Sequence, residues 1–580
     1  MVKNIVHALS IEAKPEKEGF FEGRGYALAW MPEEPVSLAT PEDYGKSRLE
    51  KTNLPFIPEP LVFSVRKKKT RKGMVTDKST VRQLEVIRKI LDRADSIIVA
   101  TEPGERGEQA FRNVYSYLEC EKPFRRLWLN STTAGAIREG FKNLHEASQY
   151  DNLYAGADCR TKVDYLININ AGAAFGLATG IAGCPFGRLQ IPVLAIICKR
   201  FLEQRKSRTT RFFEHRLMLE KDGLSMQFRI MQDIRNRKTA DKIYAYMKSC
   251  ESARILKIES QAKIQPAPLP YNLTALQKDA CARYGFSAQK TLEIAQKLYE
   301  GKLVSYPCTD SRHIPGEFLA AFPKLLRQTA YYCGLMDCLS VFDWDSLNRR
   351  SVGNTDISGH HALIPTGIYP GYLTKESKAV YDMIAARTLE VFAPDCEMQS
   401  SHIEAAVGNL VFNSKKSRVL SPSWRTVLNR EEDRAEDEAP EEVIFPEFLE
   451  NETVRISGWN LLTHKILPLT PYTEGSLLEK MENHGLGTPF SRSTVIEALI
   501  EWEYIQRQGQ YLMPAERGLV IFNCIKDMRI ADLKMAGGWE KALRDVGTGE
   551  QNAGTFLNAM KIFTRQVTGE ILSLSTPKKS

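Results

Sequence analysis

The stretch from Thr80 to Leu118 constrains the fold of this chain most strongly. Apolar residues recur at helical spacing from Thr80 to Ala94, and residues 96–101 follow as the run Ser-Ile-Ile-Val-Ala-Thr. A continuous run rich in β-branched residues is typical of a strand that is buried on both faces. A glycine-containing turn and a second helical pattern, from about Gly107 to Leu118, come next. Helix, strand, turn and helix in this order predict an α/β domain.

Length and composition set the wider limits. The chain has 580 residues, enough for roughly three to five domains of ordinary size. Its 43% hydrophobic and 26% charged residues are typical of a soluble globular protein. No apolar run reaches the ~20 residues of a membrane helix, and the N-terminus lacks the apolar stretch of a signal peptide. We therefore expect a cytoplasmic protein with no membrane partner.

The charge and the cysteines narrow the class of protein only a little. The net charge of +8 fits a protein with one positive groove that faces a polyanion, and equally a mildly basic enzyme with no nucleic-acid partner. The 11 cysteines include no Cys-x-x-Cys, and the closest pair is Cys333 and Cys338. This spacing predicts free thiols, with neither a zinc site nor a disulfide framework.

Two charged stretches stand out. The basic run Arg66–Lys72, directly before Gly73, predicts an exposed loop, with phosphate contact as the alternative. The mainly acidic stretch from Arg430 to Glu442 predicts a solvated linker.

The middle of the chain displays a tyrosine among polar groups. Leu273 to Glu300 has helical spacing, with Thr274 as a plausible cap, and Leu303 to Tyr306 has the pattern of a short strand. A phenol has a pKa near 10, so Tyr306 needs a base or positive charge nearby to act as a nucleophile. Taken alone, a Tyr-Pro turn is also an ordinary structural element. From Leu477 onward the pattern is largely helical.

Three motifs around Tyr306 resemble those of type IA DNA topoisomerases, the topoisomerase III kind in particular. Residues 306–311, Tyr-Pro-Cys-Thr-Asp-Ser, are similar to the family's active-site Tyr-Pro-Arg-Thr-Asp-Ser. Residues 359–366 resemble its His-His-Ala-Ile-Ile-Pro-Thr stretch, and residues 273–277 and 285–288 resemble the helices before the tyrosine. The resemblance implies that Tyr306 is the nucleophile. It also implies that His361, directly before Ala362, and Arg312 stabilise the scissile phosphate.

Residues 100–108, Ala-Thr-Glu-Pro-Gly-Glu-Arg-Gly-Glu, resemble the Toprim motif Ala-Thr-Asp-x-Asp-Arg-Glu-Gly-Glu. Carboxylates at the end of a strand and the start of a helix suit a Mg²⁺ ion beside phosphates. The resemblance implies that Glu102, Glu105 and Glu108 hold Mg²⁺, and the alternative is an acidic surface turn.

Further segments extend the resemblance over nearly the whole chain. Residues 126–131 and 136–138, residues 160–170, residues 187–192, and residues 472–477 and 485–492 are each similar to a family stretch. The resemblance implies that four residues contact DNA, mainly single-stranded: Arg160, Arg188, Gln190 and Arg492. For Arg188 and Arg492, surface salt bridges are the alternative.

Three departures touch the chemistry itself. Cys308 stands where the family carries an arginine, and loss of one such donor typically costs ~10²–10³ in rate. Residues 1–5 align just after the family's strand bearing Glu-Lys-Pro-Ser, so that glutamate is absent; a late start codon, a truncated gene or true loss would each explain this. In the Toprim motif, Gly104 replaces an Asp, and Glu105 and Arg106 reverse the usual order.

The resemblance implies a multidomain α/β plus α and β protein shaped like a padlock ring. Its expected parts are a Toprim-like domain (1–155), a helical DNA-binding domain (156–210 and 455–580), a β-rich arch (211–270 and 375–454) and a tyrosine domain (271–374).

The implied function is a type IA topoisomerase, an isomerase that changes DNA topology. It would cleave single-stranded DNA through a 5′-phosphotyrosine link, pass a strand and reseal, with Mg²⁺ and without ATP. The alternative is a catalytically weakened or inactive DNA-binding relative. An ATP-driven motor such as a helicase is disfavoured, because the chain has no Gly-x-x-x-x-Gly-Lys-Ser/Thr loop.

Overall fold

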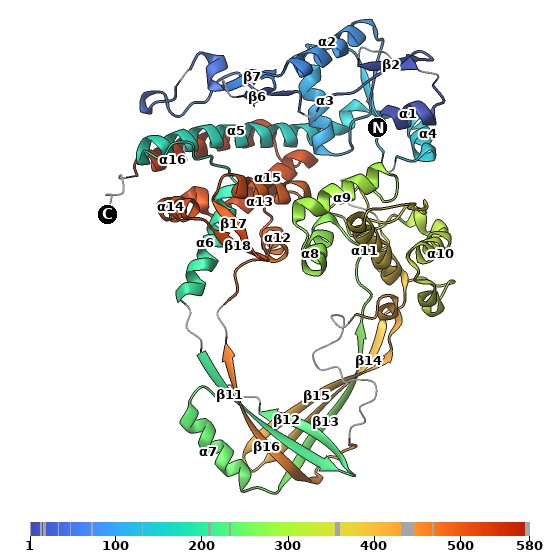
Figure 1. The fold of residues 1–580 in the computed structure, drawn as a ribbon, viewed down its shortest axis with the longest axis vertical. Helices are drawn as coiled ribbons and strands as arrows, with labels where there is room; N and C mark the ends of the chain where they lie inside the picture. Colours follow the sequence, from blue (N-terminus) through green and yellow to red (C-terminus); the bar gives the residue numbers. More distant parts are fainter. Residues whose placement is uncertain are drawn as a thin grey trace.

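The computed structural model describes residues 2–11, 14–15, 19–32, 34–46, 48–70, 73–129, 132–206, 210–230, 234–353, 360–430, 446–466 and 469–574. The ribbon has the outline of a ring (Figure 1), with helices and small sheets at one end and a β-barrel at the other. This outline and the mix of helices and strands confirm the predicted fold class.

The N-terminal part contains the predicted α/β unit. Strands β8 (Ile97–Val99) and β9 (Phe124–Arg126) pair in parallel, and α3 (Glu105–Tyr117) crosses between them. Strand β10 (His145–Glu146) extends the sheet antiparallel to β9. The remaining elements of this part are α1 (Val2–Ala8), β1 (Lys14–Pro15), β2 (Phe20–Gly23), β3 (Tyr26–Ala29), β4 (Val36–Leu38), η1 (Pro41–Tyr44), η2 (Lys51–Asn53), β5 (Phe63–Val65), α2 (Lys78–Arg93), α4 (Ala134–Lys142) and η3 (Ala147–Tyr150).

The basic run is not a loop, so that prediction is wrong. Strands β6 (Lys67–Thr70) and β7 (Gly73–Thr76) form an antiparallel hairpin, while Arg71 and Lys72 lie outside the described residues. Lys67 pairs with Asp43 at 2.6 Å and Lys68 pairs with Asp77 at 3.0 Å. Local ion pairs neutralise part of the charge that suggested an exposed loop.

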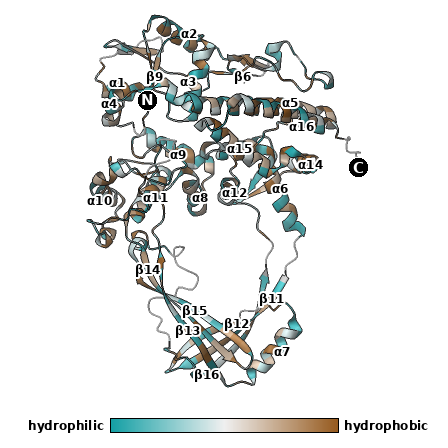
Figure 2. Cartoon of the chain, turned by 180° about the vertical axis from the view of Figure 1, so that it is seen from behind, coloured by the Kyte–Doolittle hydropathy of each residue, from teal (hydrophilic) through white to brown (hydrophobic). Residues whose placement is uncertain are grey.

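A helical base packs against this part. The long helix α5 (Asp151–Thr179) lies along α16 (Ala553–Leu572), and both views show the pair side by side (Figures 1 and 2). One large apolar cluster joins them to α6 (Gln190–Lys206) and α15 (Leu533–Thr548). The base also contains α12 (Glu474–Asn483), α13 (Pro489–Glu501), β17 (Ile505–Gln508), β18 (Tyr511–Pro514), α14 (Glu516–Ile525) and η8 (Arg529–Ala531). This content confirms the largely helical pattern predicted from Leu477 onward.

The arch is a closed barrel with strand order β11-β12-β15-β14-β13-β16. Its strands are β11 (Thr210–Lys221), β12 (Leu224–Ile230), β13 (Ser252–Gln265), β14 (Cys396–Val407), β15 (Leu410–Ser421) and β16 (Thr453–Ile466), with α7 (Arg237–Lys248) on its outside (Figure 1). Seen from behind, these strands carry both hydrophobic and hydrophilic residues, as expected where one face is buried (Figure 2). Of the acidic stretch, residues 431–442 lie outside the described residues.

Strand pairing in the barrel produces the ring. Neighbours β11 and β16 connect to the helical base through α6 and α12. Neighbours β13 and β14 connect to the part that carries Tyr306, through α8 (Leu273–Tyr284) and α11 (Lys375–Phe392). Two pairs of chain segments therefore leave the barrel toward two different bodies.

The tyrosine part consists of α8, α9 (Ala288–Glu300), η4 (Gly316–Ala321), α10 (Phe322–Cys333), η5 (Met336–Val341) and α11, with η6 (Ser423–Val427) packed on α11. The cap of α8 is Asn272, whose side chain accepts from the Ala275 amide, and not Thr274 as predicted. The predicted strand from Leu303 to Tyr306 is also wrong, because Val304 forms only a single antiparallel bridge with Pro365. Among the described residues, no helix is both long and apolar enough to cross a membrane.

Candidate active site

Tyr306 is held inside the molecule at the contact between the tyrosine part and the N-terminal part. Its side chain is only 7% exposed and packs edge-on against Tyr299, with ring centroids 5.5 Å apart. The preceding Ser305 ties this segment to the next motif, because its amide donates to the Ile364 carbonyl at 2.9 Å and its hydroxyl to the Ala362 carbonyl at 3.0 Å. Backbone pairing thus brings the two histidines toward the tyrosine.

The opposite wall of the site is the loop between β8 and α3. Gly107 permits a close turn there, since a Cβ atom on it would lie 1.8 Å from the Glu102 carbonyl oxygen. Thr101 donates to the Gly107 carbonyl at 2.7 Å, and Arg126 donates to the Glu102 carbonyl at 2.7 Å. This folding places the Glu102 carboxylate near enough to the Tyr306 phenol for its charge to raise the pKa of the phenol.

Cys308 completes the immediate surroundings of the phenol. Burial, together with Cys308 and Glu102, raises the pKa of Tyr306 well above its ordinary value of 10. Burial and then the charge of Glu102 raise the pKa of the Cys308 thiol to about 12. Both groups are therefore protonated at neutral pH, and the charge of the Glu102 carboxylate contributes to both shifts.

His360, not His361, lies against the tyrosine. The rings of His360 and Tyr306 are 4.5 Å apart at 34°. His361 instead meets Phe318 edge-on at 5.3 Å, and its Nδ1 lies 2.8 Å from the Ala362 carbonyl oxygen. The structure therefore places His360, and not the predicted His361, against the ring of Tyr306. Burial lowers the pKa of His360 to about 4, so its imidazole is neutral at physiological pH.

The three predicted metal carboxylates are not gathered. Glu108 is fully buried, and its two oxygens accept from Arg112 at 2.7 Å and Arg126 at 2.9 Å. Glu108 lies one helical turn after the start of α3, where its side chain faces the sheet and neutralises Arg126. Glu105 lies 3.6 Å from Arg160. Among the described residues, no group of three histidine, cysteine or acidic side chains could hold a metal ion.

Arg312 does not substitute for the missing arginine. Its Nε donates to the Pro270 carbonyl at 3.0 Å and its Nη2 to the Leu269 carbonyl at 3.2 Å. The side chain therefore fixes the entry to α8, and within the described residues it is not in contact with Tyr306.

Two of the predicted DNA-binding arginines form a buried ionic network. Arg160 donates through Nη1 to both oxygens of Glu540, at 2.9 and 2.7 Å, and Arg188 donates to Glu540 and to Asp164. Although burial opposes it, the charges of Arg188 and Arg160 lower the pKa of Glu540 to about 2. Arg188 is 1% exposed, so it is not a surface residue in this conformation.

The other two candidates differ in setting. Arg492 is buried on α13, where it donates to the hydroxyl of Thr274 at 2.7 Å and to the carbonyls of Leu486 and Gly487. It also lies 3.9 Å from Asp310 in the tyrosine loop, so it joins the base to the tyrosine part. Gln190, partly buried, begins α6.

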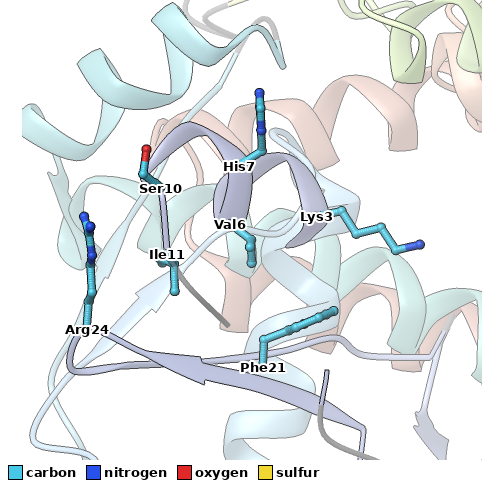
Figure 3. Close-up of a pocket in the computed structure, with 7 residues that line it drawn as sticks. All are labelled: Lys3, Val6, His7, Ser10, Ile11, Phe21 and Arg24. Atoms are coloured by element: carbon cyan, nitrogen blue, oxygen red, sulfur yellow. The ribbon is translucent and has the colours of Figure 1, made fainter. Parts of the chain in front are cut away.

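A separate pocket of about 460 Å³ lies between α1 and β2 (Figure 3). Its lining is Lys3, Val6, His7, Ser10, Ile11, Phe21 and Arg24. In Figure 3, Val6 points toward the strand that carries Phe21, while Lys3 and His7 extend away. The pocket contains none of the predicted site residues.

Comparison with known proteins agrees with this architecture. A family model described as DNA topoisomerase matches residues 148–558. The chain is 30% identical to DNA topoisomerase 3 of Bacillus licheniformis, over 96% of this chain and 78% of that protein, and equally similar to the Bacillus subtilis protein, over 96% and 79%. The chain belongs to the DNA topoisomerase family. Full-length topoisomerase I from Thermotoga maritima has the same fold, with a TM-score of 0.74 and 20% identity over 98% of this chain and 89% of that chain.

The chain is a type IA topoisomerase of the topoisomerase III kind, and Tyr306 stays the predicted nucleophile, in surroundings that differ from the family's motif. The family implies a magnesium ion, but the residues present do not fit one. Gly104 supplies no ligand, and Glu108 is committed to two arginines.

Sequence reasoning missed two residues of this topoisomerase site. Arg106 is exposed, its guanidinium lies 4.6 Å from the ring of Phe490, and its charge acts on the Cys308 thiol. Trp128 stacks on His360 at 5.6 Å and 22°. The reversed order of Glu105 and Arg106 in the motif could have indicated a role for Arg106. No local pattern indicated that Trp128 contacts His360, which lies more than 200 positions away in the sequence.

Proposed function

We propose that Tyr306 cleaves and rejoins single-stranded DNA through a 5′-phosphotyrosine link, so that another strand can pass through the ring. The observation that carries the proposal is the position of the buried Tyr306 phenol beside the Glu102 carboxylate, whose charge contributes to the raised pKa of the phenol. These groups belong to two bodies that are connected through the barrel by different routes. Cleavage at their contact would hold the two DNA ends on separate bodies.

The chemistry follows from the acid and base present. Glu102 accepts the phenolic proton as the Tyr306 oxygen bonds to phosphorus, and the bond from phosphorus to the 3′ oxygen breaks. The leaving oxygen takes the proton that Glu102 accepted and becomes the 3′ hydroxyl. Resealing is the reverse, and because the phosphotyrosine ester conserves the energy of the broken bond, no ATP is required.

DNA binding is supported by unsatisfied donors in the ionic network. The Nη2 atoms of Arg160 and Arg188 are buried and have no hydrogen-bond partner among the described residues. A buried donor without an acceptor is unfavourable, so these atoms are suited to an acceptor from outside the chain. We propose that phosphate oxygens of single-stranded DNA fill this place when the network opens, with Gln190 and Arg492 on the same body.

A second candidate, a weakened or inactive DNA-binding relative, is favoured by one specific observation. Neither Cys308 nor Arg312 places a fixed cation on the Tyr306 phenol, and such a group normally stabilises charge that develops in the transition state. A relaxation assay on negatively supercoiled plasmid, with Mg²⁺ and a Tyr306→Phe control, separates the two candidates.

The direct test is capture of the covalent intermediate. Denaturing the protein after incubation with an end-labelled single-stranded oligonucleotide should trap DNA on the peptide that contains Tyr306. Tyr306→Phe should give no adduct. Tyr299→Phe is the matched control, because it removes a neighbouring phenol 5.5 Å away and should leave the adduct unchanged. An adduct on another residue, or none with the unaltered chain, contradicts the proposal.

A further inference from the structure

A row of stacked rings crosses the contact beside Tyr306. The ring of Tyr306 lies on His360 at 4.5 Å, His360 on Trp128 at 5.6 Å, and Trp128 on Tyr150 at 4.6 Å. The last two contacts are nearly parallel, at 22° and 13°. Tyr306 and His360 belong to the tyrosine part, whereas Trp128 and Tyr150 belong to the N-terminal part. The break between the two bodies therefore falls between His360 and Trp128.

Trp128 is fixed from its own side. Tyr150 ends η3 and covers one face of the indole, and the hydroxyl of Tyr150 is 2.6 Å from Nδ1 of His145. The guanidinium of Arg126 lies 5.3 Å from the indole. Arg126 also donates to the carbonyls of Val99 and Glu102, so the indole is anchored to the loop that presents Glu102.

Two hydrogen bonds across the same boundary are long. Tyr299 donates to the Leu129 carbonyl at 3.4 Å, and Thr132 donates to the Tyr299 carbonyl at 3.5 Å. Ordinary hydrogen bonds to carbonyl oxygens are ~2.9 Å, so these two contribute little. The stacked rings, with their preferred offset geometry, are better suited to set the alignment of the two bodies.

We propose that Trp128 is a positioning residue, which holds His360 on the ring of Tyr306 and keeps the N-terminal and tyrosine parts closed on each other. Trp128 does not touch the phenol itself and acts through His360. The proposal deepens the proposed function, because it takes Tyr306 as the nucleophile whose alignment matters.

Cys308 provides a readout that needs neither DNA nor turnover. Its part-buried thiol packs against the apolar cluster that contains Tyr306, at the closed boundary, so its reaction with N-ethylmaleimide reports opening. Labelling is followed for each cysteine-containing peptide by mass spectrometry. Trp128→Ala should raise the Cys308 labelling rate about tenfold, the effect of losing one aromatic contact. Trp128→Phe keeps a ring in place and should restore slow labelling.

Three controls separate positioning from general damage. Cys198, fully buried in the helical base, should stay unlabelled, and part-buried Cys250 beside the arch should label at its original rate. Trp30→Ala removes an exposed tryptophan of the same N-terminal part that packs on Phe21, and should change nothing at Cys308. Tyr150→Ala, one ring further from Tyr306, should give a smaller rise than Trp128→Ala.

A double-mutant cycle decides whether Trp128 acts through His360. If the two side chains act through one shared contact, Cys308 in the double variant Trp128→Ala/His360→Ala should be labelled no faster than in the faster of the two single variants. The proposal is overturned if the rate increases of the two single variants multiply in the double variant. It is also overturned if Cys308 in Trp128→Ala is labelled within about twofold of the original rate. The outcome is separable from that of adduct capture: a chain that forms no DNA adduct contradicts the proposed function and leaves this test standing.

Discussion

Two interfaces of this topoisomerase differ in the kinds of contact that hold them together. Inside the helical base, α5, α15 and α16 share one large apolar cluster, and Glu540 ties Arg160 and Arg188 together in its interior. At the Tyr306 contact, stacked rings and two long hydrogen bonds join the bodies, and the charge of Glu102 acts on the Tyr306 phenol. The first is suited to remain closed, and the second to separate and re-form.

The contrast is sharpest at Glu540. Removal of one partner from a buried ionic network leaves unpaired charge, which typically costs about 4 kcal/mol. Glu540→Ala should therefore lower the free energy of unfolding of the base by about that amount. Calorimetry measures the change. Glu501→Ala, an exposed acidic residue at the end of α13, should lower the unfolding temperature far less. Equal effects at the two positions would remove the distinction between the interfaces.

Substitution of Cys308 tests whether a missing positive charge beside Tyr306 is what limits the rate of DNA cleavage. Cys308→Arg should raise the single-turnover rate of oligonucleotide cleavage by ~10², because a fixed positive charge near the phenol stabilises the transition state. Cys308→Ser is the matched control and should leave the rate near that of the original chain. A Cys308→Arg variant with no gain, while its binding of DNA is unchanged, would favour the inactive relative.

Acid should weaken the Tyr306 contact before it affects the base. Burial depresses the pKa of His360 from 6.5 to about 4, so the unfolded state binds the extra proton between these values. Stability is fully present above pH 6.5 and is lost as the pH falls toward 4, by up to about 3 kcal/mol. His360→Gln should flatten this dependence in thermal unfolding scans between pH 4 and 7. Glu540, with its pKa near 2, stays charged throughout that range.

The sequence predicted the fold well where local pattern and motif agreed. The strand at residues 96–101 and its flanking helices have the expected order, and the motifs at Tyr306 and Glu102 do come together. Orientation was harder to predict. Neighbours His360 and His361 face different partners, and Glu108 turns inward to Arg126. Such choices depend on contacts between distant segments, for which spacing along the chain carries no signal.

Metal removal should produce the smallest change. Gly104 carries no carboxylate and Glu108 is paired with two arginines, so the motif does not form a site of three carboxylates. Arg106, in contrast, places a permanent positive charge near Cys308. Cleavage of a single-stranded oligonucleotide should therefore stay within about twofold when EDTA replaces Mg²⁺, since the electrostatic stabilisation in this site is not tied to a bound ion. Arg106→Gln should lower the same rate by more than chelation does, and gel analysis of the adduct measures both. A chelator effect larger than the Arg106→Gln effect would show that Glu102 and Glu105 bind a metal despite the altered motif, and that the Tyr306 contact depends on it.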